Sequence, residues 1–369
     1  MSSLFGLCGI SSVACGLVIF AATASNSVGQ TNVPSAPASA PAPPNTASAS
    51  DSARISIDVE VTDKSGRPIG GLDAGDFTLL DNKQPQKLVD FHAVDASSTQ
   101  ADPVSVLILV DTINNTIDTV AREREQLGEF LKLNNGELAH PTSIGFFADS
   151  GLKLAAGPTR DGNALFASLG GSQSELRAIG RAAGYWGDTE RLQDSLKMLD
   201  QLFQSEAARP GRKLVLFISS GWPMLPWAGD QSNTKQRTQV FNIIVELTNQ
   251  LRAADMVLYC LDPFDLGRTN PYFYQGYLKG VAKVNQAQYA DLGLQVIAEH
   301  SGGQVIVNGN DIRAEIDAAI RQASTYYTLT FNAAPATGTT DYHALSVKTD
   351  KPGLTVRTTA GYYVQGSAP

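Results

Sequence analysis

The sequence predicts an α/β protein in which a mostly parallel sheet, with helices on both faces, is inserted in or flanked by a β-sandwich. Two observations predict this fold class. Between residues 103 and 323, apolar strand-like runs alternate with amphipathic helix-like segments, the order typical of a parallel sheet covered by helices. On either side, residues 54–98 and 326–364 show the short alternating pattern of half-buried strands.

The run VSVLILVD, residues 104–111, is the most informative element of the α/β region. Its first part has apolar or small residues without polar alternation, which indicates a strand that is buried on both faces. Open α/β sheets place their ligand sites beyond the carboxyl ends of the strands. We therefore expect Asp111, at the end of this run, to lie close to the functional site.

The remaining elements of the α/β region follow from the same patterns. Strands are predicted at 104–110, 143–148, 213–219, 256–262 and 304–308. Helices are predicted at 116–132, 189–204, 234–254, 287–300 and 311–323. In the last of these, Ile312, Ile316 and Ile320 recur at the spacing of one helix face, so this helix should pack against the sheet.

The two flanking segments read as β-structure. Ile55, Ile57 and Val59 alternate with polar residues, as expected of a strand with one buried face. Further strands are predicted at 77–80, 87–91, 326–331, 344–347 and 354–364. Neither segment has enough strands for a sandwich by itself, but together they supply about six. We expect a single sandwich built from both segments; two independent small β-domains are the alternative.

The N-terminus has the pattern of an export signal over residues 1–24. An apolar stretch at 4–22 is followed by Ala22-Thr23-Ala24, which fits a small-residue cleavage site. An uncleaved membrane anchor is the alternative, because the stretch approaches the ~20 residues that a bilayer requires. Residues 25–53, rich in Ala, Pro and Ser, are predicted to form a disordered linker because they cannot bury enough apolar surface to fold.

Composition argues against a nucleic-acid partner and against a disulfide-stabilised fold. The 369 residues carry a net charge of -8, which argues against nucleic acid because phosphate binding needs a basic face. Cys8 and Cys15 lie in the predicted signal, and only Cys260 would remain after cleavage. No internal disulfide framework is therefore expected. The protein should be secreted or periplasmic, without a stable membrane span after signal cleavage.

Several motifs resemble those of von Willebrand factor A (VWA) domains. They are the buried strand that ends at Asp111, the loop Gly187-Asp188-Thr189 before a helix, and the strand KLVLFISSG at 213–221. The flanking sequences VEVTDKSGRPIGGLDAGDFTLLDNKQPQKLVDF and LTVRTTAGYYV resemble those of the acidobacterial VWFA-related domain family. The resemblance covers about residues 54–364. It implies a VWA-like (Rossmann-like) sheet with a binding role.

The resemblance also implies a metal-ion-dependent adhesion site, but the motif is degenerate here. VWA domains commonly hold a divalent cation between a D-x-S-x-S loop, a threonine from a second loop and an aspartate from a third. Asp111 matches the first position, whereas Ile113 and Asn115 replace the two serines. Thr189 matches the threonine, and Ser220 replaces the aspartate of the third loop.

The implied metal ligands are Asp111, Asn115, Thr189 and Ser220, and Asp188 can add a second carboxylate. Hard cations require a nearly octahedral set of oxygen atoms. A set with one motif carboxylate predicts weak binding of Mg²⁺ or Mn²⁺. The alternative is that Asp111 accepts hydrogen bonds from the amides and hydroxyls of neighbouring loops and that no metal is held.

Aromatic residues gather in the loops predicted at the carboxyl ends of the strands. Such residues are typical of recognition surfaces, because Trp and Tyr supply a large contact area with few rotatable bonds. They can equally pack on one another to order long loops. The candidate ligand-binding residues are Trp186, Trp222, Trp227, Tyr272, Phe273 and Tyr274.

The sequence gives no support to an enzyme. None of the four histidines, His92, His140, His300 and His343, has metal-ligand spacing with another histidine or cysteine. There is no G-x-S-x-G elbow, P-loop or dinucleotide-binding glycine motif. Cys260, inside a predicted strand, is expected to be a buried small hydrophobe.

The sequence therefore predicts an exported binding protein that recognises an unidentified protein or cell-surface ligand. The binding face would carry Asp111, Thr189, Ser220 and the aromatic loops. The alternative is a structural or scaffold role in an envelope assembly, in which the β-sandwich makes the contacts.

Overall fold

In the computed structural model, the residues described are 54–94, 104–171, 184–225, 233–263, 272–309 and 311–366. The chain divides into two units, residues 1–49 and 50–369, and every described residue belongs to the second. The predicted signal peptide and linker lie outside the described residues.

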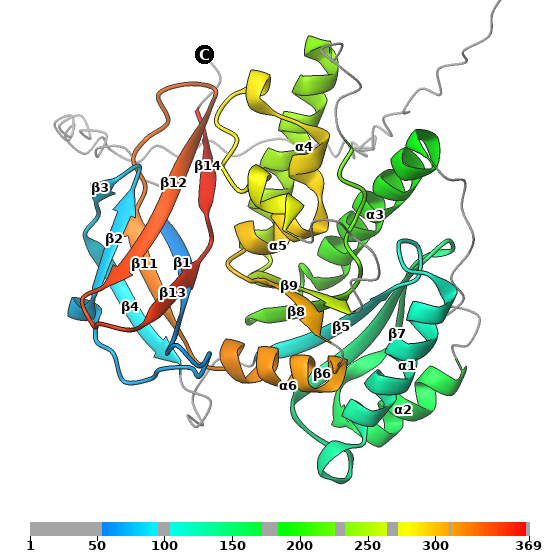
Figure 1. The fold of residues 1–369 in the computed structure, drawn as a ribbon. Helices are drawn as coiled ribbons and strands as arrows, with labels where there is room; N and C mark the ends of the chain where they lie inside the picture. Colours follow the sequence, from blue (N-terminus) through cyan, green and yellow to red (C-terminus); the bar gives the residue numbers. More distant parts are fainter. Residues whose placement is uncertain are drawn as a thin grey trace, which may run out of the picture. The chain divides into compact units, whose positions relative to one another are not determined.

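The α/β region is built on a mostly parallel sheet (Figure 1). Within the described ranges, its strand order is β10-β9-β8-β5-β6-β7. These strands are β5 (Ser105–Asp111), β6 (Glu137–Ala148), β7 (Gly151–Asp161), β8 (Lys213–Ile218), β9 (Met256–Pro263) and β10 (Val305–Gly309). β5 pairs in parallel with both β6 and β8, so the apolar run that ends at Asp111 lies inside the sheet.

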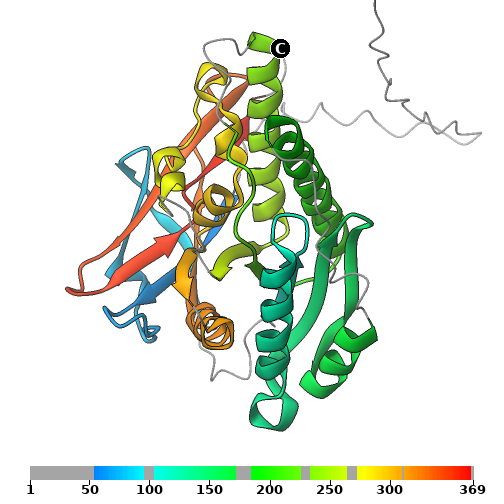
Figure 2. The ribbon, with the colours of Figure 1, turned by 45° about the vertical axis from the view of Figure 1, so that its right-hand side comes forward.

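Helices cover both faces of this sheet (Figures 1 and 2). They are α1 (Ile117–Leu131), α2 (Gly162–Gly171), α3 (Tyr185–Glu206), α4 (Thr234–Ala253), α5 (Leu294–His300) and α6 (Ile312–Ala323). Val106, Ile108 and Val110 share one core with α1, α2 and α6. Leu107 and Leu109 share the other core with α3, α4 and α5. This two-sided burial explains why β5 lacks polar alternation.

Parts of the α/β region differ from the sequence prediction. β7, which is antiparallel to β6, and α2 follow one another where no element was predicted. The helix predicted at 287–300 is confined to α5. Two short 3₁₀ turns, η5 (Val284–Gln286) and η6 (Tyr289–Leu292), precede it. Gly293 separates them from α5 because its backbone is extended, with φ −65° and ψ 141°.

The flanking segments form two antiparallel sheets. In the part of the chain that is described, their strand orders are β13-β1-β11-β4 and β14-β12-β2-β3. The strands are β1 (Arg54–Thr62), β2 (Phe77–Asp81), β3 (Gln84–Pro85), β4 (Leu88–Val94), β11 (Tyr326–Asn332), β12 (Thr340–Thr349), β13 (Thr355–Thr358) and β14 (Gly361–Gln365). Each sheet combines strands from both ends of this unit.

The two sheets pack face to face around one apolar core. The ring of Phe77 on β2 lies 5.0 Å from that of Tyr327 on β11, measured between centroids. Phe331 on β11 similarly contacts Tyr362 on β14, at 5.9 Å. The residues predicted as one strand at 354–364 are split between β13 and β14, which belong to different sheets.

A buried ion network joins this β-sandwich to the α/β region, and we call it the interface network: Asp58, Glu60, Arg212, Tyr259 and Arg357. Arg212, just before β8, contacts Glu60 Oε1 at 2.7 Å and Asp58 Oδ2 at 2.8 Å. On the second oxygen, Glu60 accepts from the hydroxyl of Tyr259 at 2.6 Å and contacts Arg357 Nη2 at 3.1 Å. Both Arg212 and Glu60 are almost completely buried.

The interface network also sets the charge states of its members. Burial acts to raise the pKa of Glu60, but the two arginines and the hydrogen bonds outweigh it and lower that pKa. Burial raises the pKa of Asp58 to about 6, against the opposing pull of Arg212. Glu60 therefore loses its proton more readily than Asp58, and it is the stronger ion-pair partner of Arg212.

Candidate functional site

The carboxyl ends of β5 and β8 bring two predicted loops together. Val110 is in register with Ile218 across these neighbouring strands, so the residues that follow them meet at the same edge of the sheet. The Ser219 hydroxyl donates to Asp111 Oδ2 at 2.8 Å. This edge contains the candidate site that the sequence indicated.

The carboxylate of Asp111 is fully buried and fully hydrogen-bonded. Its Oδ1 accepts from the backbone N–H groups of Ile113 at 3.1 Å and Asn114 at 3.0 Å. Its Oδ2 accepts from the Asn114 amide at 2.8 Å and from Ser219. Burial raises the pKa of Asp111, and these hydrogen bonds oppose the rise. The Asp111 side chain therefore holds the loop that follows β5 and the residue Ser219 together by hydrogen bonds.

Asn115 connects the first loop with the third. Its amide nitrogen donates to Glu123 Oε1 at 2.6 Å, and its Oδ1 accepts from the backbone N–H of Ser220 at 2.8 Å. Ile113, between Asp111 and Asn115, is buried in the core on the side of α3 and α4. The first loop is thus fixed by an apolar anchor and by amide hydrogen bonds.

Thr189 and Asp188 do not lie in a loop, which corrects the sequence prediction. Both belong to the first turns of α3, which begins at Tyr185 after Gly184, a residue with φ 86°. The Thr189 hydroxyl donates to the carbonyl oxygen of Tyr185 at 2.7 Å, and Asp188 forms an ion pair with Arg191. Both side chains are therefore engaged within their own helix.

Ser195 takes the place beside the first loop that was predicted for Thr189. The Asn114 amide donates to its hydroxyl at 3.0 Å. Ser195 lies six residues after Thr189 in α3, which corresponds to about 9 Å along a helix axis. No local motif marks Ser195 in the sequence; it is brought to the site by the packing of α3 on the sheet.

These residues do not fit a divalent cation. Asp111 already accepts from four donors, Ile113 supplies no ligand atom, and Thr189 is displaced along α3. The described residues contain no group of three or more His, Cys, Asp or Glu side chains that could hold a metal ion. A VWA-type cation site would require an open set of oxygen ligands, which the described residues at this edge of the sheet do not present.

Two further carboxyl groups, those of Glu123 and Glu315, lie near Asp262. Burial raises the pKa of Glu123 well above its usual value, with smaller contributions from Asp111 and Asp262. Glu315, in the first turn of α6, has its pKa raised to about 7, first by burial and then by Asp311 and Asp262. Neither oxygen of Glu315 has a hydrogen-bond partner among the described residues. Sequence reasoning missed Glu123 and Glu315, because helical carboxylates usually face solvent.

The candidate aromatic residues divide into buried and exposed groups. Trp222 is 3% exposed and packs on Phe147 and Phe217, so it is a core residue, which corrects its assignment to a recognition surface. Tyr274 is likewise buried, at 4% exposure. Trp227 lies outside the described residues.

The exposed group has two parts. Trp186 is 80% exposed and makes an edge contact with Tyr185, while Tyr272 and Phe273 are 47% and 50% exposed. Tyr185 lies close enough to Tyr289 on η6 to add to the rise that burial causes in the pKa of Tyr289. η6 in turn packs on η4 (Phe273–Tyr277). We call Tyr185, Trp186, Tyr272 and Phe273 the aromatic surface.

The groups considered for catalysis are engaged elsewhere in the structure. Cys260 is fully buried in β9. His343 contacts Asp81 at 2.9 Å inside the β-sandwich, and His140 contacts the hydroxyl of Ser324 at 2.8 Å. Among the described residues, no histidine is hydrogen-bonded to Ser219.

Comparisons with known proteins give no family assignment. No protein-family model matches the chain, and no curated protein matches it. Among solved structures, the pilus adhesin SpaC of Lactobacillus rhamnosus GG matches with 11% identity and a TM-score of 0.34, over 80% of this chain and 42% of that one. The chain therefore spans less than half the length of this adhesin.

Two further solved structures match at a similar level. The N-terminal domain of TFIIH p34 has 14% identity and a TM-score of 0.31, over 60% of this chain and 99% of that one. Proximal thread matrix protein 1 of the mussel byssus has 11% identity and a TM-score of 0.31, over 66% and 49%. Likenesses of this strength carry no argument about function. Within the described residues, no helix has the length and apolar character to span a membrane.

Proposed function

We propose that this chain is an exported, VWA-like binding protein that recognises a protein or cell-surface ligand through its aromatic surface, without a bound metal and without catalysis. The observation that carries the proposal is the contrast at the carboxyl end of the sheet. The residues of the adhesion motif are sealed in a hydrogen-bonded loop, whereas Trp186 is 80% exposed. Exposed Trp, Tyr and Phe side chains are the types enriched at interfaces.

Exposure alone costs free energy, which supports a binding role for the aromatic surface. Large apolar side chains gain stability from burial, and none of these four contributes to the described cores. A partner that covers Trp186 and Phe273 would bury them at little cost in side-chain entropy, since each has few rotatable bonds. A hot spot of this kind is typically aromatic and central in an interface.

The test is affinity capture by the immobilised chain from an envelope extract of the source organism. We expect the double variant Trp186→Ala/Phe273→Ala to lose captured partners that the wild type enriches, by about tenfold or more. Val89→Ala on β4 is the matched control, because Val89 is an exposed apolar residue of the β-sandwich, at 42% exposure. The control should capture partners as the wild type does.

Two outcomes would contradict this proposal. Equal capture by the double variant would remove the aromatic surface from recognition. Loss of partners in the Val89→Ala control, with retention in the double variant, would favour the scaffold role of the β-sandwich. Circular dichroism of each variant establishes that the compared proteins are folded.

A further inference from the structure

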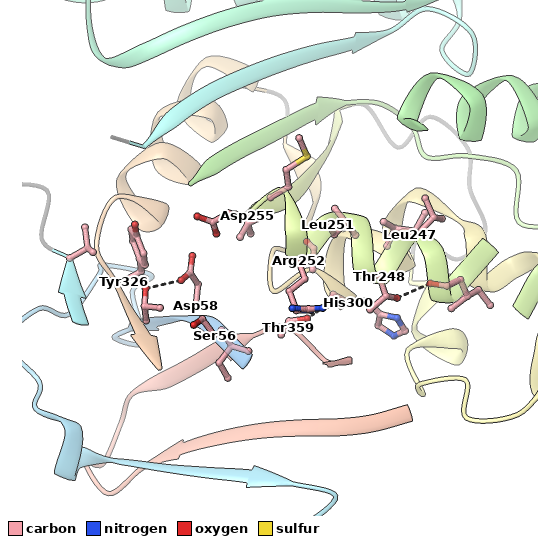
Figure 3. A pocket seen from close by; sticks show the side chains of 18 of the residues that line it. Ser56, Asp58, Leu247, Thr248, Leu251, Arg252, Asp255, His300, Tyr326 and Thr359 are labelled. Carbon is pink, nitrogen blue, oxygen red and sulfur yellow. Dashed lines mark hydrogen bonds between the residues drawn. The ribbon is translucent and has the colours of Figure 1, made fainter. Parts of the chain in front are cut away.

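A pocket of about 330 Å³ lies between the α/β region and the β-sandwich (Figure 3), and none of the aromatic-surface residues lines it. We call it the α4 pocket. It is bounded by the C-terminal half of α4, the start of β9, α5 and the outward face of β1, β4 and β11. β9 begins beside this pocket and runs toward the edge that carries Asp111, so the two sites lie at opposite ends of the sheet.

The α4 pocket has one apolar wall and one polar wall. Leu247 and Leu251 of α4 line it together with Val257 of β9. On the other side, Ser56 and Asp58 of β1 line it from the polar face of the sandwich sheet. A pocket of this size and mixed lining is typical of small-molecule sites, which fall at about 300–1,000 Å³. Its ligand should therefore be amphipathic.

Two acidic side chains at one end of the pocket, Asp58 and Asp255, each have a cation close by. Asp58 is paired with Arg212 at 2.8 Å. Asp255 lies near Lys213, where it opposes the lowering of the pKa of that amine by burial. Asp291 of η6 also lines the pocket; it accepts a hydrogen bond from the backbone N–H of Gln288 at 2.7 Å, and burial raises its pKa to about 6.

Arg252, at the other end, is a cation of the pocket without an acidic partner among the described residues. Figure 3 shows it on the same side as His300, Thr248 and Thr359, with Asp58 and Asp255 on the opposite side. The guanidinium of Arg252 forms no hydrogen bond or ion pair with the side chains of the described residues, although it lines the pocket. Burial lowers the pKa of His300, whose Nε2 contacts the carbonyl oxygen of Leu278 at 3.1 Å, so this ring adds no charge.

We propose that the α4 pocket binds a small organic carboxylate with an apolar body. Its carboxylate would lie at Arg252, whose planar guanidinium suits two parallel hydrogen bonds to such a group. Its body would lie along Leu247, Leu251 and Val257. The proposal is independent of the aromatic surface, because none of the aromatic-surface residues lines this pocket.

The test is calorimetric titration of the full chain with decanoate and 4-phenylbutyrate, two carboxylates with different apolar bodies. We expect saturable binding of at least one, and the tighter one identifies a chain-like or an aromatic body. Decylamine, which carries the opposite charge on the same chain, should bind at least tenfold more weakly than decanoate.

Two variants locate the binding. Arg252→Gln should weaken carboxylate binding about tenfold, the loss expected for one charged hydrogen-bonded contact. Thr248→Trp, which places a large ring inside the pocket, should abolish binding while circular dichroism shows the chain folded. Arg313→Gln, on the exposed surface of α6 and outside the pocket, is the matched control and should bind as the wild type does.

The proposal is overturned by any of three results. One is the absence of saturable binding of either carboxylate to the wild type. Another is equal affinity in the wild type and Arg252→Gln. The third is decylamine binding as tight as that of decanoate.

Discussion

Asp111 shows how neighbouring side chains decide the role of a single carboxylate. Its position at the end of β5 is that of a ligand group in the VWA motif, yet each of its oxygens accepts two hydrogen bonds from the protein. Ile113 anchors the loop in the core where the motif has a serine. Both oxygens of Asp111 are therefore used to stabilise the loop, and neither is open to coordinate a cation.

Asp111→Ala should destabilise the protein by about 3 kcal/mol, because it leaves several buried donors without an acceptor. The loss should be the same with and without millimolar MgCl₂. Urea unfolding followed by circular dichroism measures both. Asp118→Ala is the control, since Asp118 is exposed in the first turn of α1 and should contribute less than about 1 kcal/mol. Stabilisation of the wild type by Mg²⁺ that disappears in Asp111→Ala would contradict this account.

At this scale the sequence indicates which strand ends meet, but not which side chains complete the contacts. The apolar runs place Asp111 beside Ser219 and Ser220, because adjacent parallel strands end at one edge. Ser195 comes from a helix 81 residues away in sequence from Asn114. Such a contact depends on how far α3 extends past the sheet, and no local pattern carries that information.

The sequence predicts a secondary-structure element clearly where one face, or both faces, of the element is buried over several residues. β5 and α6 are clear for this reason: β5 is apolar at nearly every position because both of its faces are buried, and the apolar residues of α6 repeat at the period of a helix. β7 was missed because an antiparallel strand at the edge of the sheet has a weaker apolar pattern than the strands inside it. α2 was missed because it is short and begins and ends with glycine, a poor helix former. Trp222 was misassigned because its loop turns back into the core.

The first turn of α6 predicts a pH-dependent stability. The pKa of Glu315 is raised to about 7 in the folded chain, from 4.5, so the folded state binds the proton more tightly than the unfolded state. Protonated Glu315 therefore adds to the free energy of unfolding below pH 4.5, and this stabilisation is lost as the pH rises through 7. Glu315→Gln should therefore be more stable than the wild type at pH 8, by about 1 kcal/mol after solvent screening.

Denaturant unfolding of Glu315→Gln and the wild type at pH 4.5, 6 and 8 measures this difference. The advantage of the variant should shrink toward the acid end. Glu129→Gln, an exposed carboxylate near the end of α1, is the control and should show a smaller change across the series. A constant difference between Glu315→Gln and the wild type at all three pH values would contradict the assignment.

For the molecule from residue 54 onward, the interface network fixes how the β-sandwich meets the α/β region. Arg212 belongs to the α/β region and Glu60 to the sandwich, and the side chains of both are excluded from water. Sequence patterns could not identify the pair, since a buried arginine before a strand looks like any charged residue at a strand end. Arg212 therefore reaches its carboxylate partners, Asp58 and Glu60, only when the two parts meet.

Arg212→Met should destabilise the protein by about 3–5 kcal/mol, because it leaves Glu60 buried without its main cation. Chemical denaturation measures the change. Arg313→Met is the control: Arg313 and its partner Asp311 are both exposed, at 42% and 53%, so the loss of this pair should cost less than about 1 kcal/mol. A loss in Arg212→Met no larger than that of the control would show that the interface network does not hold the two parts together.

The interleaving of strands in the β-sandwich also has a consequence for the order in which the chain is made. Ser56 and Thr330, whose hydroxyls meet across β1 and β11, are 274 residues apart. During synthesis, β1 and β2 emerge early and stay without their partners until β11 and β12 follow, and such late closure is slow. Unpaired strand edges invite association with other chains. A stop codon after the α/β region would therefore damage the beginning of the protein, although it removes none of the residues there.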